Sequence, residues 1–236
     1  MNIYGLYKRY RTDKVFRGRF ALWRSAGVDV VYAVFRLITG FIYGSKWFVT
    51  LAVYYLGLSV IRFTLIRSYD RVSKDREKYD IKFEYGRYRL SGIFLLILTL
   101  PLSGMAAQTV IKNSSFNYPG LVIYASATYT FYIATMAIIN VVRYREIGSP
   151  ILSASKAITL ATAAVSLFGL QTAMLSHFSG NDTAFKMIMN AVTGGMVIVV
   201  VIALAIYMII TSTQKTCQYL FENIVFLYAK NMRSFA

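Results

Sequence analysis

Long apolar runs separated by short polar segments dominate the chain from residue 28 to residue 212. A helix of about 20 apolar residues crosses the roughly 30 Å of hydrocarbon in a bilayer, with a range of about 17–25 residues. The pattern therefore predicts an all-α, polytopic integral membrane bundle. Four runs meet the required length, and they are Ser91 to Ile111, Gly120 to Val142, Ile151 to Ser176 and Met187 to Ser212.

Two further runs near the start of the chain each contain an arginine. The run Trp47 to Ile66 is long enough, and its Arg62 lies near one end, from which a long side chain can snorkel to the interface. The run Val28 to Tyr43 is only 16 residues long and has Arg36 near its middle, so an amphipathic helix lying in the interface would have a similar sequence. We therefore expect six transmembrane helices, with five plus a short hairpin helix as the alternative.

The distribution of lysine and arginine favours six crossings. Seven basic residues precede Val28 and eight lie between Arg67 and Arg89, and the positive-inside tendency places both segments in the cytoplasm. They share a side only if residues 28–43 cross the bilayer. We predict a multi-pass protein of the plasma (inner) membrane with both termini in the cytoplasm. The connections on the opposite side hold only Lys46, Lys112 and Lys186.

The composition supports a membrane protein and argues against a nucleic-acid-binding one. Of the 236 residues 57% are hydrophobic and 15% charged, against about 45–50% and about 25% in soluble domains. A net charge of +16 would by itself suggest a nucleic-acid partner. Because the basic residues are concentrated between apolar runs, they orient helices instead. We expect membrane lipids as partners, with anionic headgroups at the cytoplasmic face, and no nucleic acid.

These features divide the chain into five parts, which are given at the end of this paragraph. The third part, residues 67–90, contains a stretch that alternates hydrophobic and polar residues at the period of a strand. We interpret this stretch as a loop packed on the interface, since a lone strand would be marginal. The alternating residues are Tyr79, Ile81, Phe83 and Tyr85. The five parts are a basic and aromatic cytoplasmic arm (1–27), a transmembrane hairpin (28–66), a charged cytoplasmic loop (67–90), a four-helix transmembrane region (91–212) and a cytoplasmic amphipathic helix that continues the last span (213–236).

Residues able to carry out catalysis are scarce. The chain has one cysteine, Cys217, and one histidine, His177, so no zinc site or disulfide framework is expected. The four clear runs contain no Asp, Glu, His or Cys, which argues against a catalytic site and against proton coupling through a carboxylate in those runs. We expect no enzyme activity, no cofactor and no metal. Asp29, Arg36 and Arg62 could pair inside the bundle, but three residues are too few to identify a site.

Neutral polar residues are frequent in the last four runs, and two of these runs contain residues that disturb helices near mid-membrane. These are Pro101 in the third span and Gly194-Gly195 in the sixth, corresponding positions if the chain is a three-plus-three inverted duplication. Hydroxyls and amides at that depth can bind a solute, although they also commonly join membrane helices. The predicted ligand site comprises Pro101, Ser103, Thr128, Tyr129, Thr162, Ser166, Asn190 and Thr193.

Two functions follow as alternatives. One is a small transporter or channel-like protein for a neutral or weakly charged solute, without coupling through an intramembrane carboxylate. The other is a non-catalytic membrane subunit whose basic face docks a cytoplasmic partner or anionic lipid, as a partner subunit or a homo-oligomer. A lipid-modifying enzyme ranks third for want of titratable residues. A continuous polar cavity would favour transport, and a dry, tightly packed bundle would favour the subunit.

Overall fold

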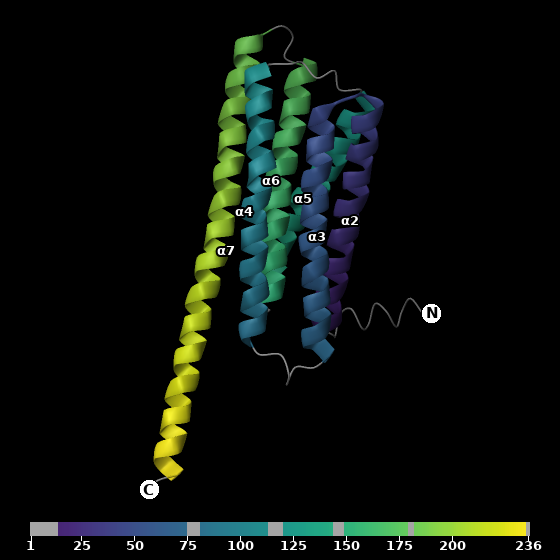
Figure 1. Ribbon diagram of the computed structural model, residues 1–236. Coiled ribbons are helices and arrows are strands. Elements are labelled where there is room, and N and C mark those ends of the chain that lie inside the picture. The colour runs from purple at the N-terminus through teal and green to yellow at the C-terminus, as the bar shows by residue number, and fades with distance from the viewer. Residues whose placement is uncertain (1–13, 75–80, 113–119, 144–148, 179–181, 235–236) are drawn as a thin grey trace, which may run out of the picture.

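The computed structural model describes residues 14–74, 81–112, 120–143, 149–178 and 182–234. Within these ranges the protein is all-helical, and its helices lie side by side in one elongated bundle (Figure 1). Every helix is long and apolar enough to cross a membrane. The predicted six-helix membrane bundle is therefore confirmed. The helices are α2 (Lys14–Ile42), α3 (Lys46–Lys74), α4 (Ile81–Lys112), α5 (Gly120–Arg143), α6 (Pro150–Phe178) and α7 (Thr183–Ser234).

The first helix is much longer than its apolar run suggests. Helix α2 has 29 residues and offers a candidate span from Phe16 to Ile42. The basic residues before Val28 made the segment that precedes it resemble a separate arm. A helix can nevertheless continue through basic residues at a membrane interface, because their long side chains reach the polar layer. As a result Asp29 lies near the middle of α2 rather than at its edge.

Helices α2 and α3 form the tight hairpin that the sequence predicts. The turn is closed by a hydrogen bond of 3.0 Å from the Ser45 amide to the Gly40 carbonyl. Gly44 has a φ of 58°, a left-handed conformation that glycine adopts at little cost. A Cβ atom at Gly40 would lie 2.8 Å from Val49 Cγ2, so the absence of a side chain there lets the two helices meet.

Two local predictions for α4 and α7 are wrong. Residues 81–85, interpreted as a loop, form the first turns of α4, because a short alternation next to a long apolar run is not enough to interrupt a helix. The expected disturbances at Pro101 and Gly194 leave both helices unbroken. Gly194 instead permits close packing, since a Cβ there would lie 3.2 Å from Ala106 Cβ.

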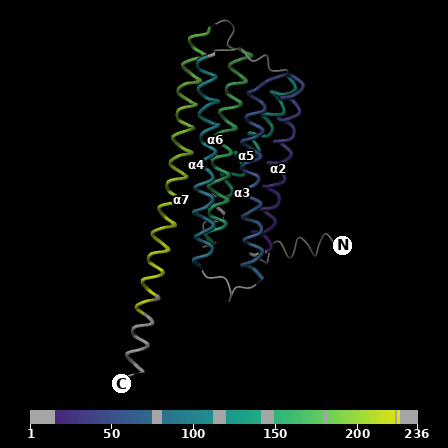
Figure 2. The backbone as a smooth tube through the Cα atoms, viewed as in Figure 1, coloured from purple at the N-terminus to yellow at the C-terminus, as the bar shows by residue number. Residues whose placement is uncertain are grey.

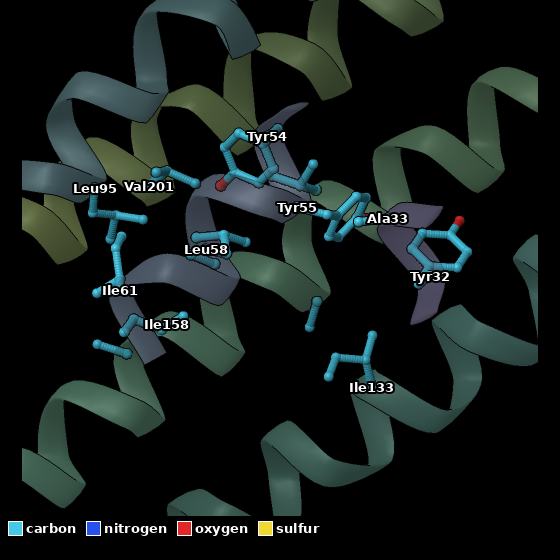
Figure 3. Close-up of a cluster of buried hydrophobic side chains, with 14 of the residues drawn as sticks. Tyr32, Ala33, Tyr54, Tyr55, Leu58, Ile61, Leu95, Ile133, Ile158 and Val201 are labelled. Carbon is cyan, nitrogen blue, oxygen red and sulfur yellow. The ribbon is translucent and has the colours of Figure 1, made fainter. Parts of the chain in front are cut away.

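The most deeply buried spans are α3 and α6, with 56% and 67% of their apolar windows buried. Figure 3 shows Leu58 of α3 within a cluster that draws on several helices, including Leu95 of α4, Ile158 of α6 and Val201 of α7. Helix α4 packs closely along α7, and this pair borders α3 and α6 (Figure 2). Any group inside the bundle is therefore expected to lie against α3 or α6.

Candidate functional site: a buried charged and aromatic cluster

An ion pair joins the middles of α2 and α3. Arg62 Nε donates to Asp29 Oδ2 at 2.6 Å, and both side chains have 0% exposure. The sequence suggested two places for the Arg62 side chain, the interface by snorkelling or a pair inside the bundle, and the structure shows the pair. Its carboxylate partner lies one helix away inside the bundle, and pairing there is less costly than exposing the charge to hydrocarbon.

The pair is completed by hydroxyl groups from α5 and α6. Arg62 Nη1 lies 3.2 Å from Thr159 Oγ1, and Nη2 lies 3.4 Å from Thr162 Oγ1. The Tyr129 hydroxyl donates to the second oxygen of Asp29 at 3.2 Å. Two helices thus supply the ion pair and two more supply its hydrogen-bond partners, which is how buried charges are normally compensated.

A second buried arginine lies on the same helix as Asp29, about two turns further on. Arg36 has 2% exposure, and its guanidinium donates to the Tyr32 hydroxyl at 2.6 and 2.9 Å and to Ser126 Oγ of α5 at 2.9 Å. It also lies 5.2 Å from the ring centroid of Phe48. Arg36 therefore faces protein rather than lipid, in the interior of the bundle that the sequence suggested for it.

Stacked tyrosines connect the two arginine centres. The rings of Tyr32 and Tyr129 are stacked with centroids 3.5 Å apart and planes 1° from parallel. Tyr55 of α3 meets both rings edge-on, at 4.9 and 5.7 Å, an arrangement that the quadrupoles of aromatic rings favour. Tyr32 bonds Arg36 while Tyr129 bonds Asp29, so the tyrosines carry contacts from one charged group to the other.

Within the described residues, the cluster holds one carboxylate and two guanidinium groups. Its other polar members are hydroxyls, so the site has a net positive charge. Such an arrangement can hold four helices in fixed register. If opened to water, it also offers a cationic surface to an anion.

The predicted ligand residues divide among several places. Tyr129 and Thr162 belong to the cluster, and Ser166 lies beside it, where its carbonyl accepts a bond of 3.2 Å from Thr130 Oγ1. Asn190 and Thr193 instead tie α7 to α6, through Thr172 at 3.2 Å and Gln171 at 2.8 Å.

The remaining predicted residues do not meet this group. Ser103 donates to the carbonyl of Thr99 in its own helix at 2.8 Å, and exposed Thr128 donates to the carbonyl of Tyr124 at 3.0 Å. Pro101 lies half-buried within α4. The eight residues line neither of two cavities among the described residues, of about 610 and 230 Å³, whose walls are mostly apolar.

The sequence analysis named Asp29, Arg36 and Arg62 as residues that could pair inside the bundle, but it did not include them in the predicted site. A search for carboxylates limited to the four clear runs left out Asp29, and the boundary set at Val28 placed it at the membrane edge. The useful signal was the seven-residue spacing of Asp29 and Arg36, which puts both on one face of a helix. A charged face of that kind needs partners on neighbouring helices.

The six apolar helices define the class of protein. The chain is a multi-pass integral membrane protein with six candidate spans. Comparison with protein-family models and with curated proteins finds no match to it.

Proposed function

We propose that this protein is a non-catalytic membrane subunit that binds a partner protein through the projecting end of α7. The observation that carries the proposal is the length of this helix. Its 52 residues correspond to about 78 Å, whereas a bilayer with its headgroup layers is about 40–45 Å thick. Figure 1 shows the C-terminal end of α7 extending well beyond the other helices.

The point at which α7 leaves the bundle is marked by a hydrogen bond. Ser212 Oγ donates to the carbonyl of Tyr85, near the start of α4, at 2.6 Å. Helix α7 then continues to Ser234, a further 33 Å or so at the α-helical rise. An isolated helix in water gains little stability from propensity alone, so a partner for this segment would stabilise it.

The projecting segment carries an apolar stripe. Leu220, Phe221, Ile224 and Val225 are each between 41% and 69% exposed. Their spacing puts them along one side of the helix, which suits the apolar face of a second helix. Because Ser212 lies beside Tyr85, four residues from the start of α4, the stripe at residues 220–225 lies beyond that end of α4.

Charge favours an acidic partner over a second copy of this chain. In the described residues, three helix ends at this end of the bundle are basic and contain only two acids, Asp70 and Glu84. The bases are Lys14, Arg17 and Arg19 of α2, Arg71 and Lys74 of α3, and Lys82, Arg87 and Arg89 of α4. Two copies docked side by side would bring like charges together, which costs association free energy. We therefore assign the stripe to an amphipathic helix with acidic flanks on a different protein.

Site-specific photo-crosslinking in native membranes tests this proposal. A photoreactive residue at Phe221 should give one adduct of defined mass, and the variant Ile224→Asp should abolish it while membrane insertion is unchanged. The same photoreactive residue at Lys215, which is exposed on the opposite side of the helix, is the matched control. The captured protein, once identified, should bind the purified chain, and Ile224→Asp should weaken that binding.

Two outcomes would count against the proposal. Equal adducts from positions 215 and 221 would show that capture is unspecific. An adduct of twice the mass of this chain would assign the stripe to self-association.

Transport is the second candidate, and the buried charges favour it. Charged residues at membrane depth often mark solute or ion pathways, and an apolar pair of similar volume would be at least as stabilising as a buried ion pair. The buried Tyr54 hydroxyl, which has no hydrogen-bond partner among the described residues, offers a bonding site to water. The net positive charge of the cluster extends the expected solutes from neutral to small anionic ones.

Flux into reconstituted vesicles tests this second function. Uptake or conductance of small neutral and anionic solutes should be lost in Arg36→Gln if the cluster binds them. Loss in the triple variant Ser103→Ala, Ser166→Ala and Asn190→Leu would instead locate the path at the predicted neutral site. If vesicles containing the unaltered protein take up no more solute than empty vesicles, transport is excluded for these solutes and the subunit role is the better proposal.

A further inference from the structure

A cavity of about 230 Å³ lies between α3 and α4, outside the charged cluster. Along α4 it extends from Arg87 to Leu98, a length of about 16 Å at the α-helical rise. At its inner end, a Cβ on Gly57 would lie 2.5 Å from Leu98 Cδ2, so the two helices touch there and close the cavity. Its rim includes Val60 and Ile97, which are 64% and 53% exposed. The cavity therefore opens sideways, toward lipid.

The polar groups of the cavity are concentrated at one end. Thr64 and Ser91 each donate to a carbonyl of their own helix at 2.9 Å. The half-buried guanidinium of Arg87 stacks 4.9 Å from the Phe83 ring and has no carboxylate partner in the described part of the chain. The cavity is thus an apolar slot with a cation at its mouth.

The depth of Arg87 matches the phosphate layer of a membrane. It precedes the apolar run that begins at Ser91 by four residues, or about 6 Å along the helix. That run of 21 residues is close to the hydrocarbon thickness. A group bonded to Arg87 would lie among headgroups while the slot extends into hydrocarbon.

We propose that this slot binds an anionic glycerophospholipid, with its phosphate on Arg87 and one acyl chain between α3 and α4. Water does not suit an apolar slot because it would lack polar partners. An acyl chain restores the dispersion contacts that an empty slot would lose. An anionic headgroup is favoured over a zwitterionic one because Arg71, Lys74 and Lys82 lie at the adjoining ends of the same two helices.

Native mass spectrometry of the purified protein, titrated with phosphatidylglycerol or phosphatidylcholine, tests the assignment. Arg87→Gln should weaken phosphatidylglycerol binding about five-fold, the factor that corresponds to one basic residue at a membrane surface, and Arg87→Lys should largely retain it. Arg67→Gln is the matched control, because Arg67 also stacks on a phenylalanine four residues earlier, at 4.6 Å, but does not line the cavity. It should bind phosphatidylglycerol as the unaltered protein does.

A second variant tests the acyl-chain slot itself. Thr64→Phe should fill the cavity and reduce phosphatidylglycerol binding while leaving Arg87 in place. Unchanged binding in Thr64→Phe would overturn the slot. Equal losses in Arg87→Gln and Arg67→Gln, or equal binding of the two lipids, would overturn the assignment to an anionic lipid at Arg87.

Discussion

The ring of Tyr32 lies flat against the ring of Tyr129, with centroids 3.5 Å apart, and this contact joins the first helix of the bundle to α5. Each tyrosine also bonds a different charged residue, Arg36 in one case and Asp29 in the other. The charged groups of the first hairpin are therefore held by the second half of the chain.

Removing the carboxylate of the buried ion pair should destabilise the protein strongly. Asp29→Asn leaves Arg62 buried without its counter-charge, and breaking a buried pair in this way costs about 3–5 kcal/mol. A large fall in the Tm of the detergent-purified protein is expected. The variants Arg19→Gln and Asp70→Asn break a more exposed pair with a 3.0 Å contact and should cost about 0.2–1 kcal/mol each.

Replacing both partners of the buried pair should be better tolerated than replacing one. The double variant Asp29→Asn, Arg62→Leu removes both charges, so its Tm should lie above that of Asp29→Asn alone. If the double variant is the less stable of the two, the charge of Arg62 is not what destabilises Asp29→Asn.

The hydroxyl and the ring of Tyr129 should make separable contributions. Tyr129→Phe keeps the stack on Tyr32 but removes the hydrogen bond to Asp29, at a cost of about 1.5–3 kcal/mol for a bond to a charged group. Tyr129→Leu removes the stack as well and should be less stable by a further 0.5–1.5 kcal/mol or so. Thermal unfolding of the two variants measures the difference, and equal Tm values would mean that the stack adds nothing.

Besides Gly194 of α7, a glycine of α4 lets these two helices approach closely. A Cβ at Gly92 would lie 3.0 Å from the carbonyl oxygen of Ala205, a backbone atom that cannot move independently. Gly92→Ala should therefore lower the Tm. Gly104→Ala on the same helix is the control, since nothing lies within 4 Å of its Cβ position. That variant should be neutral or more stable by up to about 1 kcal/mol, from helix propensity.

The orientation of the bundle is tested by cysteine labelling. In a Cys217→Ser background, an impermeant thiol reagent added outside intact cells should label Lys46→Cys but not Ser73→Cys. Both positions are exposed at the ends of α3, and the basic segments predict that only the Ser73 end faces the cytoplasm. Labelling of Ser73→Cys alone would reverse the topology.

Hydropathy was sufficient to predict the number of helices but not their ends or their polar contacts. Apolar length identifies a span such as Gly120 to Val142, because lipid selects for it directly. Apolar length does not predict where a helix ends among basic residues. The predicted first span therefore started at Val28, which placed Asp29 at the edge of the membrane. Of the predicted ligand residues, Tyr129 and Thr162 reach the charged cluster, whereas Thr128, one position away from Tyr129, faces outward. Single-residue direction of this kind depends on helix rotation, which an almost uniformly apolar span does not specify.

The charged residues of the first hairpin find some of their hydrogen-bond partners on later helices, and this has a consequence for biosynthesis. When α2 and α3 leave the ribosome, Arg36 still lacks Ser126 and Arg62 still lacks Thr159 and Thr162, because those residues belong to helices made later. Each arginine exposed at the centre of a bilayer costs about 2.5–3.5 kcal/mol on insertion scales. The hairpin should therefore remain beside the translocon, or in a wet and shallow position, until α5 and α6 have been synthesised, and a chain truncated before Gly120 should be retained there or degraded.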